Sequence, residues 1–171
     1  SNGIIVHNSK CTMLYPCSVL AGKNSRADYL GVALASKGQN QDTGTKVYHA
    51  GENTTSTSIN KSISKDGGIA TYRGLIHVSK KAINSKVNVR CDAMMTDNLS
   101  KSNTIPYMKI ENNKTSVEHE ATISKISEDQ LFYLMSRGLN ENEAKKQIIK
   151  GFFEILINNS NLENLKNKLK E

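Results

Sequence analysis

A chain of 171 residues with a formal charge of +7 is long enough for one domain, or for one domain with an appendage, that buries about two-thirds of its unfolded surface. Its three cysteines, Cys11, Cys17 and Cys91, form no CxxC pair, which argues against a disulfide framework or a zinc ribbon and favours a reducing compartment. No apolar run approaches the length of a membrane span, and because the first residue is Ser rather than Met, we expect a processed product or a fragment.

The positive charge does not predict nucleic-acid binding. From Ser127 onward the chain carries seven acidic and seven basic side chains, so the excess lies upstream, as scattered lysines rather than a patch. Aromatic side chains that would stack on bases are few. Lys, Asn and Ile make up nearly a third of the chain, which is typical of an A+T-rich gene. This composition favours a plastid gene, in an apicoplast-like relict or an algal plastid, with a low-G+C bacterial cytoplasm as the alternative.

Residues 3 to about 122 consist of short apolar alternations broken by Gly, Asn and Ser, which is typical of β-strands. Asparagines recur in turn-like segments at spacings of 29, 31 and 29 residues: Asn24, Asn53, Asn84 and Asn113. Asparagine tolerates the left-handed backbone conformation, and turns at near-constant spacing are typical of stacked coils. The pattern therefore predicts a mainly β fold, a β-solenoid rather than a sandwich.

Helical periodicity begins at Ser127, where Ser-Glu-Asp-Gln forms a capping box and Gly138 provides the stop. An apolar stripe lies between them: Leu131, Leu134 and Met135.

A second helix is predicted from Asn140, with Glu143 three residues on. Its broad apolar face contains Ala144, Ile148, Phe152 and Leu156. Such a face packs on its own domain or, alternatively, docks a partner. After a break at residues 158–161, a weaker amphipathic segment follows: Leu162, Leu165 and Leu169.

The segment SVEHEATIS, residues 116–124, carries candidate metal ligands. In an extended strand, Glu118 and Glu120 share one face, whereas His119 lies in the apolar row with Val117. An imidazole flanked by carboxylates can hold iron or zinc. The alternative is a hydrogen-bonded core histidine with two solvated glutamates outside.

Cys91 has two interpretations as well. It follows Val87 and Val89 on one strand face, so it is either a small buried hydrophobic residue or a thiolate ligand.

Four segments closely resemble the SufB/SufD family of the SUF iron–sulfur cluster assembly system, C-terminal portion only: QDTGTKVYHAGENTTSTSINKSIS at 41–64, YRGLIHVSKKA at 72–82, VRCDAMM at 89–95 and VEHEATISKISEDQLFYLMSRGL at 117–139. The resemblance runs from about Tyr15 to Phe153. It implies a right-handed parallel β-helix core, residues 1–124, followed by a small α-helical region, residues 125–171.

The resemblance also implies a function: a scaffold that holds a nascent iron–sulfur cluster at an interface with SufD. Helical regions would engage the SufC ATPase, and sulfur would arrive from a cysteine desulfurase with its transfer proteins. Cys91 matches the family's interface cysteine, and Glu118, His119 and Glu120 match a triplet of further ligands. These four residues favour the SufB branch of the family, with the cluster transient and no tightly bound cofactor expected in the isolated chain.

Departures from the family narrow the expectation. Family members are longer, and their sulfur-accepting cysteine lies in an N-terminal region without a counterpart here, so Cys11 and Cys17 receive no role. An open N-terminal coil favours a homo-oligomer.

With no GxxxxGK[ST] motif, we expect no intrinsic ATPase and no enzyme activity. Two alternatives remain: a SufD-like partner-binding solenoid without metal, and a carbohydrate-active solenoid enzyme that uses Glu118 and Glu120.

Overall fold

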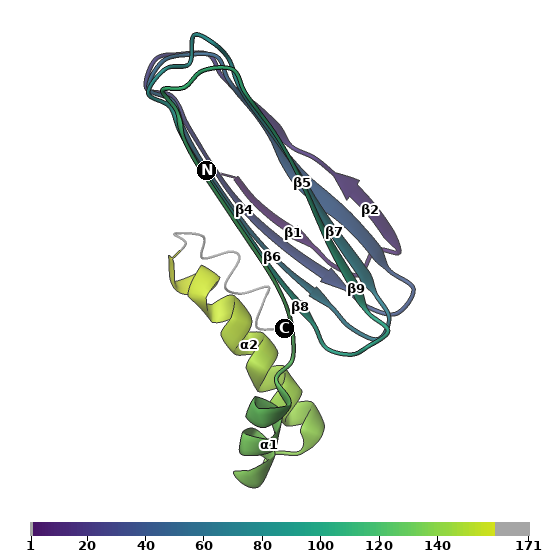
Figure 1. Ribbon diagram of the computed structural model, residues 1–171. Helices are drawn as coiled ribbons and strands as arrows, with labels where there is room; N and C mark the ends of the chain where they lie inside the picture. The colour runs from purple at the N-terminus through teal and green to yellow at the C-terminus, as the bar shows by residue number, and fades with distance from the viewer. Residues whose placement is uncertain (1, 160–171) are drawn as a thin grey trace.

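The computed structural model describes residues 2–159, with side chains as far as Phe153, and shows a parallel β-solenoid of about four turns followed by two helices (Figure 1). The described strands are β1 (Asn2–Val6), β2 (Cys11–Leu14), β3 (Cys17–Leu20), β4 (Arg26–Ala35), β5 (Asn40–His49), β6 (Thr55–Ser64), β7 (Ile69–Val78), β8 (Lys86–Met95), β9 (Lys101–Ile110) and β10 (Ser116–Lys125). The helices are α1 (Glu128–Ser136) and α2 (Glu141–Asn159). The predicted solenoid and the first two helices are confirmed; the predicted third amphipathic segment lies outside the described residues.

From β4 to β10, successive strands alternate between two facing sheets. Sheet A has the order β1-β4-β6-β8-β10, and sheet B has the order β2-β5-β7-β9, with β3 also paired to β5. All pairs are parallel, and the register places Arg26 beside Thr55, Thr55 beside Lys86, and Lys86 beside Ser116. Each coil therefore repeats after about 30 residues, as the asparagine spacing predicted.

The asparagine turns explain the coil length. Asn24, Asn53 and Asn84 have φ values of 62°, 54° and 56°, in the left-handed region that asparagine tolerates. The fourth turn is built differently, because the Asn112 side-chain carbonyl accepts hydrogen bonds from the Lys114 amide at 3.0 Å and the Thr115 hydroxyl at 2.8 Å. Asn113 is not among the residues with positive φ, but the predicted turn lies where the spacing placed it.

The interior contains a polar ladder beside its apolar cluster. His49 is 1% exposed, with Nδ1 2.7 Å from the Thr54 hydroxyl and Nε2 2.9 Å from the Ser56 hydroxyl. Thr54 continues the ladder to Ser85 of the next coil, with 2.7 Å between the hydroxyl oxygens. Burial lowers the pKa of His49 to about 4, so the ring is neutral at pH 7.

Both helices begin as the sequence predicted. The Ser127 hydroxyl accepts from the Gln130 amide at 3.4 Å, while Asn140 and Glu143 cap each other's backbone amides at 3.0 and 2.9 Å. Among residues 2–159, no helix combines the length and apolarity that a membrane crossing needs.

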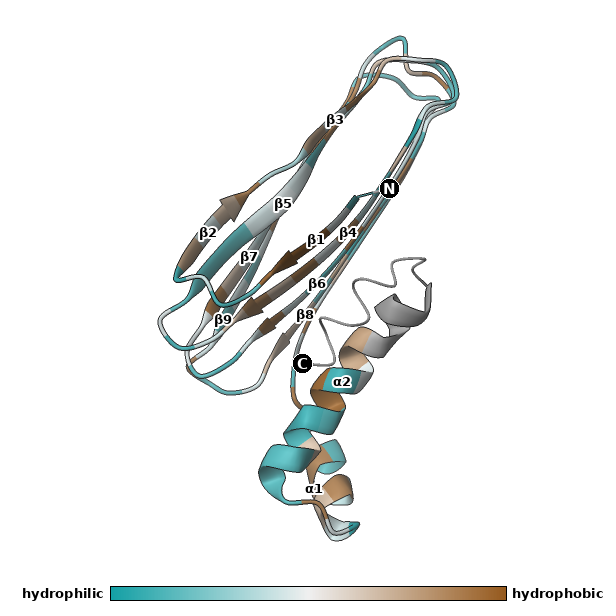
Figure 2. Ribbon diagram, turned by 180° about the vertical axis from the view of Figure 1, so that it is seen from behind, coloured by the Kyte–Doolittle hydropathy of each residue, from teal (hydrophilic) through white to brown (hydrophobic). Residues whose placement is uncertain are grey.

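Helix α2 packs on the outer face of sheet A. Phe153 is buried against Val32 and Ile63, and Figure 2 shows hydrophobic stretches both in α2 and in the neighbouring strands. The described part of the apolar helix face therefore packs on its own chain. This agrees with the first interpretation of that face, packing on its own domain rather than docking a partner.

The His49 ladder makes stability depend on pH. The folded-state pKa lies below the ordinary value of 6.5, so protons bind the unfolded chain preferentially. We expect the free energy of unfolding to be highest above pH 6.5 and to fall by up to about 3 kcal/mol as the pH decreases towards 4. Urea unfolding at several pH values checks this. His49→Gln should flatten the profile in that window; an unchanged slope would contradict the assignment.

Candidate functional site

Cys91 lies on the inner row of β8, where it is 3% exposed. Burial first, and then the charge of Asp92, raise the pKa of the thiol to about 12, although a hydrogen bond with the Tyr72 side chain lowers it. The group is therefore a protonated thiol at pH 7. Binding of a thiol to a metal releases its proton, so the raised pKa disfavours metal binding by Cys91 in this closed arrangement.

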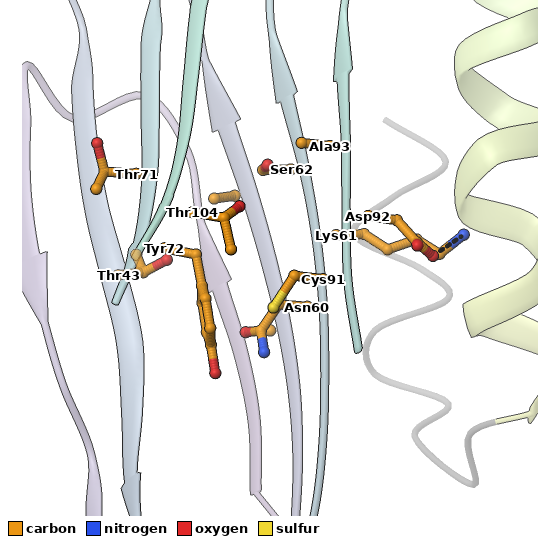
Figure 3. Close-up of a pocket in the computed structure, with 12 residues that line it drawn as sticks. Thr43, Asn60, Lys61, Ser62, Thr71, Tyr72, Cys91, Asp92, Ala93 and Thr104 are labelled. Carbon is orange, nitrogen blue, oxygen red and sulfur yellow. Dashed lines mark ion pairs between the residues drawn. The ribbon is translucent and has the colours of Figure 1, made fainter. Parts of the chain in front are cut away.

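Several polar side chains line the space beside Cys91. A cavity of about 20 Å³, room for about one water molecule, is lined by residues that include Gly31, Thr43, Asn60, Tyr72, Cys91 and Thr104. The close-up in Figure 3 shows Tyr72 and Cys91 directed into the same interior space, from sheets B and A. The Tyr72 hydroxyl also lies 3.0 Å from the Thr45 hydroxyl and 3.4 Å from the Ser58 hydroxyl.

Glycine makes room for one member of this group. Asn60 is the register partner of both Gly31 and Cys91, so the three residues form one inner row across sheet A. A Cβ atom on Gly31 would collide with the Asn60 side-chain oxygen. Glycine at position 31 therefore allows an amide to project into the interior next to Cys91.

The Glu118–His119–Glu120 triplet lies on β10, one strand away from Cys91, which is the register partner of Ala121. Neighbouring strands are about 4.8 Å apart, so Ala121 lies directly beside Cys91, and the triplet that precedes Ala121 lies beside residues 88–90. Both β10 and β9 end their sheets, so within residues 2–159 each has one edge without a strand partner. The candidate residues therefore lie at the open end of the solenoid.

The four candidates fall on two faces. Cys91 and His119 belong to the inner rows, since His119 is in register with the buried Val89. Glu118 and Glu120 belong to the outer row. Among residues 2–159, no group of three or more His, Cys, Asp or Glu side chains is close enough to hold a metal ion.

The expectation that His119 is a buried member of the apolar row is half right. It occupies the inner row, but it is exposed, because no further coil covers β10 within the described residues. A core role for the imidazole is therefore wrong for this state, and the ring is accessible to ligands.

Each glutamate is held by its register partner on β8. Asn88 donates to Glu118 Oε2 at 3.0 Å, and Arg90 Nε lies 3.8 Å from Glu120 Oε2. Sequence reasoning missed Asn88, Arg90 and Tyr72. Asn88 and Arg90 could have been predicted from the sequence, because each lies one coil of 30 residues before Glu118 or Glu120.

The burial of the three thiols predicts their reactivity. Cys11 and Cys17 are exposed, whereas Cys91 is buried with a raised pKa. At pH 8 we expect a thiol-disulfide reagent to label two cysteines quickly and Cys91 only after denaturation, measured by mass spectrometry of the labelled peptides. The Cys91→Ala variant should show the same fast phase and no slow one. Fast labelling of native Cys91 would mean that the end coil opens readily.

Comparisons with known proteins identify the family of this chain. Residues 2–152 match the model of the family described as "SUF system FeS cluster assembly, SufBD core domain". The chain is 53% identical over 146 residues to the iron-sulfur cluster assembly protein SufB of Bacillus subtilis, and 51% identical over the same length to SufBD family proteins of Staphylococcus saprophyticus and Staphylococcus epidermidis. Each alignment covers 85% of this chain and 31% of the relative, so the chain spans about a third of their length.

These relatives are bacterial, so the comparisons give no support to the plastid origin expected from the composition. An A+T-rich bacterial gene accounts for the same composition. The family match covers most of the residues, including every candidate ligand and both described helices up to Phe152. The chain belongs to the SufBD family of iron–sulfur cluster assembly proteins.

Proposed function

We propose that this chain is the part of a SufB-type scaffold on which a nascent iron–sulfur cluster is held during assembly. The carrying observation is the register of β8 and β10, which brings Cys91 and the Glu118–His119–Glu120 triplet to the open end of one sheet. The cluster is the cargo of this site. Cys91 supplies a thiolate, and the triplet supplies weaker nitrogen and oxygen ligands.

A mixed ligand set suits a scaffold that must release its product. Thiolates bind iron–sulfur clusters more strongly than carboxylates or imidazoles do, so a site with one cysteine is labile. The protonated, buried Cys91 adds a condition for loading: the end coil must open enough to admit the cluster and release the thiol proton. Sulfur would arrive from a cysteine desulfurase through its transfer proteins.

The open end is also the proposed interface with SufD. Unpaired strand edges readily add a strand from another chain. Exposed apolar side chains lie on these last strands, among them Ile105, Tyr107 and Ile123. A partner strand there would cover His119 and complete the ligand set from the other side.

The helical region is the proposed docking site for the SufC ATPase. Helix α1 exposes Phe132 at 74%, Tyr133 at 56% and Met135 at 43%, an apolar surface suited to a protein partner. We keep the division into a β-helix core, residues 1–124, and a helical region, residues 125–171, as part of this proposal. The chain would act as a scaffold rather than an enzyme, in a reducing bacterial cytoplasm that suits its free thiols.

Anaerobic reconstitution with iron and sulfide tests the proposal. The chain is treated alone and with SufD and SufC, followed by visible absorption and iron determination. We expect cluster absorption with the partners present, and its reduction to background in Cys91→Ala, because the thiolate is the strongest ligand. Cys17→Ala is the matched control, since Cys17 is exposed on β3 and lies outside the site.

Two results would contradict the proposal. Equal absorption and iron content in Cys91→Ala and in the unaltered chain would remove Cys91 from the ligand set. The absence of any cluster even with both partners would leave a partner-binding solenoid without metal.

A further inference from the structure

The outer face of sheet A carries a buried ion pair under helix α2. Lys61 Nζ and Asp92 Oδ2 are 3.5 Å apart, and the two side chains are 7% and 8% exposed. The same ammonium donates to the backbone carbonyl of Phe152 in α2 at 2.8 Å and lies 4.4 Å from the centre of the Phe152 ring. A buried charge is costly unless its hydrogen-bonding capacity is satisfied, and α2 supplies part of that satisfaction for the Lys61 ammonium. Figure 3 shows Lys61 and Asp92 directed towards the helix, away from the interior that Cys91 faces.

Asp92 is shared with a second cation. Arg90 Nε lies 3.2 Å from Asp92 Oδ2 and 3.8 Å from Glu120 Oε2. Arg90 therefore stands between a carboxylate that α2 influences and a carboxylate of the triplet. The contacts form one continuous chain along the outer face, from the Phe152 carbonyl through Lys61, Asp92 and Arg90 to Glu120.

We propose that Arg90 is a positioning residue for Glu120. Whether Arg90 interacts with Glu120 depends, through Lys61 and Asp92, on whether α2 is packed against sheet A. The five groups form a relay that joins the helical region to the candidate ligands. The relay itself rests only on the contacts between these five groups. Its effect on iron rests on the proposed function, because it requires Glu120 to be a ligand.

Electrostatics gives the relay a direction. When α2 is packed on sheet A, the Lys61 ammonium interacts with both the Phe152 carbonyl and Asp92. Its interaction with Asp92 is therefore weaker, and Asp92 interacts more strongly with Arg90. When α2 is displaced, Lys61 loses the carbonyl and the ring and pairs more fully with Asp92. Arg90 then turns towards Glu120. A seated helix therefore leaves Glu120 loosely held and available, and a displaced helix ties Glu120 to Arg90.

Two substitutions should shift Arg90 in opposite directions. Phe153→Leu reduces the buried contact that seats α2 and should move Arg90 towards Glu120. Lys61→Met removes the ammonium but keeps an apolar stem, so Asp92 has only Arg90 left among these contacts, and Arg90 should move away from Glu120. Opposite responses are not expected from a general loss of stability.

The first experiment needs no metal. Exchange of the Arg90 Nε proton with solvent is measured by NMR in each background, with and without Glu120→Gln. We expect Glu120→Gln to accelerate exchange by about two- to fivefold more in Phe153→Leu than in the unaltered chain, and to have no effect in Lys61→Met. Arg26, whose Nε lies 2.9 Å from Asp28 on the same strand, is the internal control and should not respond.

The second experiment titrates each variant anaerobically with Fe²⁺ alone. We expect Phe153→Leu to weaken binding by about two- to fivefold, and Arg90→Gln to abolish that difference. Arg26→Gln is the matched control, and in its presence Phe153→Leu should still weaken Fe²⁺ binding.

The outcomes separate the relay from the proposed function. If Arg90 exchange is insensitive to both substitutions, or responds in the same direction to both, the relay is wrong whatever the iron titration gives. If Phe153→Leu does not fold, Lys61→Met alone decides, and an undiminished response of Arg90 exchange to Glu120→Gln in that background overturns the relay.

If Arg90 responds as expected and no variant binds Fe²⁺, the relay stands and Glu120 loses its role as a ligand. If Fe²⁺ binds equally well to all variants, Arg90 does not position Glu120 for iron.

Discussion

In-register parallel stacking is the constraint on which the rest of this structure depends. Each strand residue lies beside its counterpart about 30 residues away, so a choice of inner or outer face in one coil is repeated in the next. Interior polar groups must then find partners across coils, as Thr54 does with Ser85. The same constraint fixes which side chains surround Cys91, because Asn60 precedes it and Ala121 follows it in the row.

Much of this arrangement was predictable from the sequence, because turns and caps are local. The asparagine spacing predicted the coil length, and the capping boxes predicted where both helices begin. The proximity of Cys91 to the triplet also follows from the coil length, since one coil after Cys91 is Ala121.

Three features were not predictable, for physical reasons. The exposure of His119 depends on β10 being the last described strand of its sheet, a property of the assembled stack rather than of the local alternation. The Tyr72–Cys91 contact joins residues on opposite sheets, which coil spacing alone does not align. The burial of Lys61 depends on where α2 comes to lie, and a lysine at a strand position ordinarily predicts solvent.

The contact between Lys61 and α2 depends little on which side chain stands at position 152. The hydrogen bond that joins Lys61 to α2 goes to a main-chain carbonyl, and the contact with the Phe152 ring is additional to it. Substitution at position 152 can remove the aromatic ring, but every amino acid there still presents the same oxygen. The ammonium therefore registers where the helix backbone lies, and a rotation or a slide by one residue would break the contact while leaving the helix sequence intact.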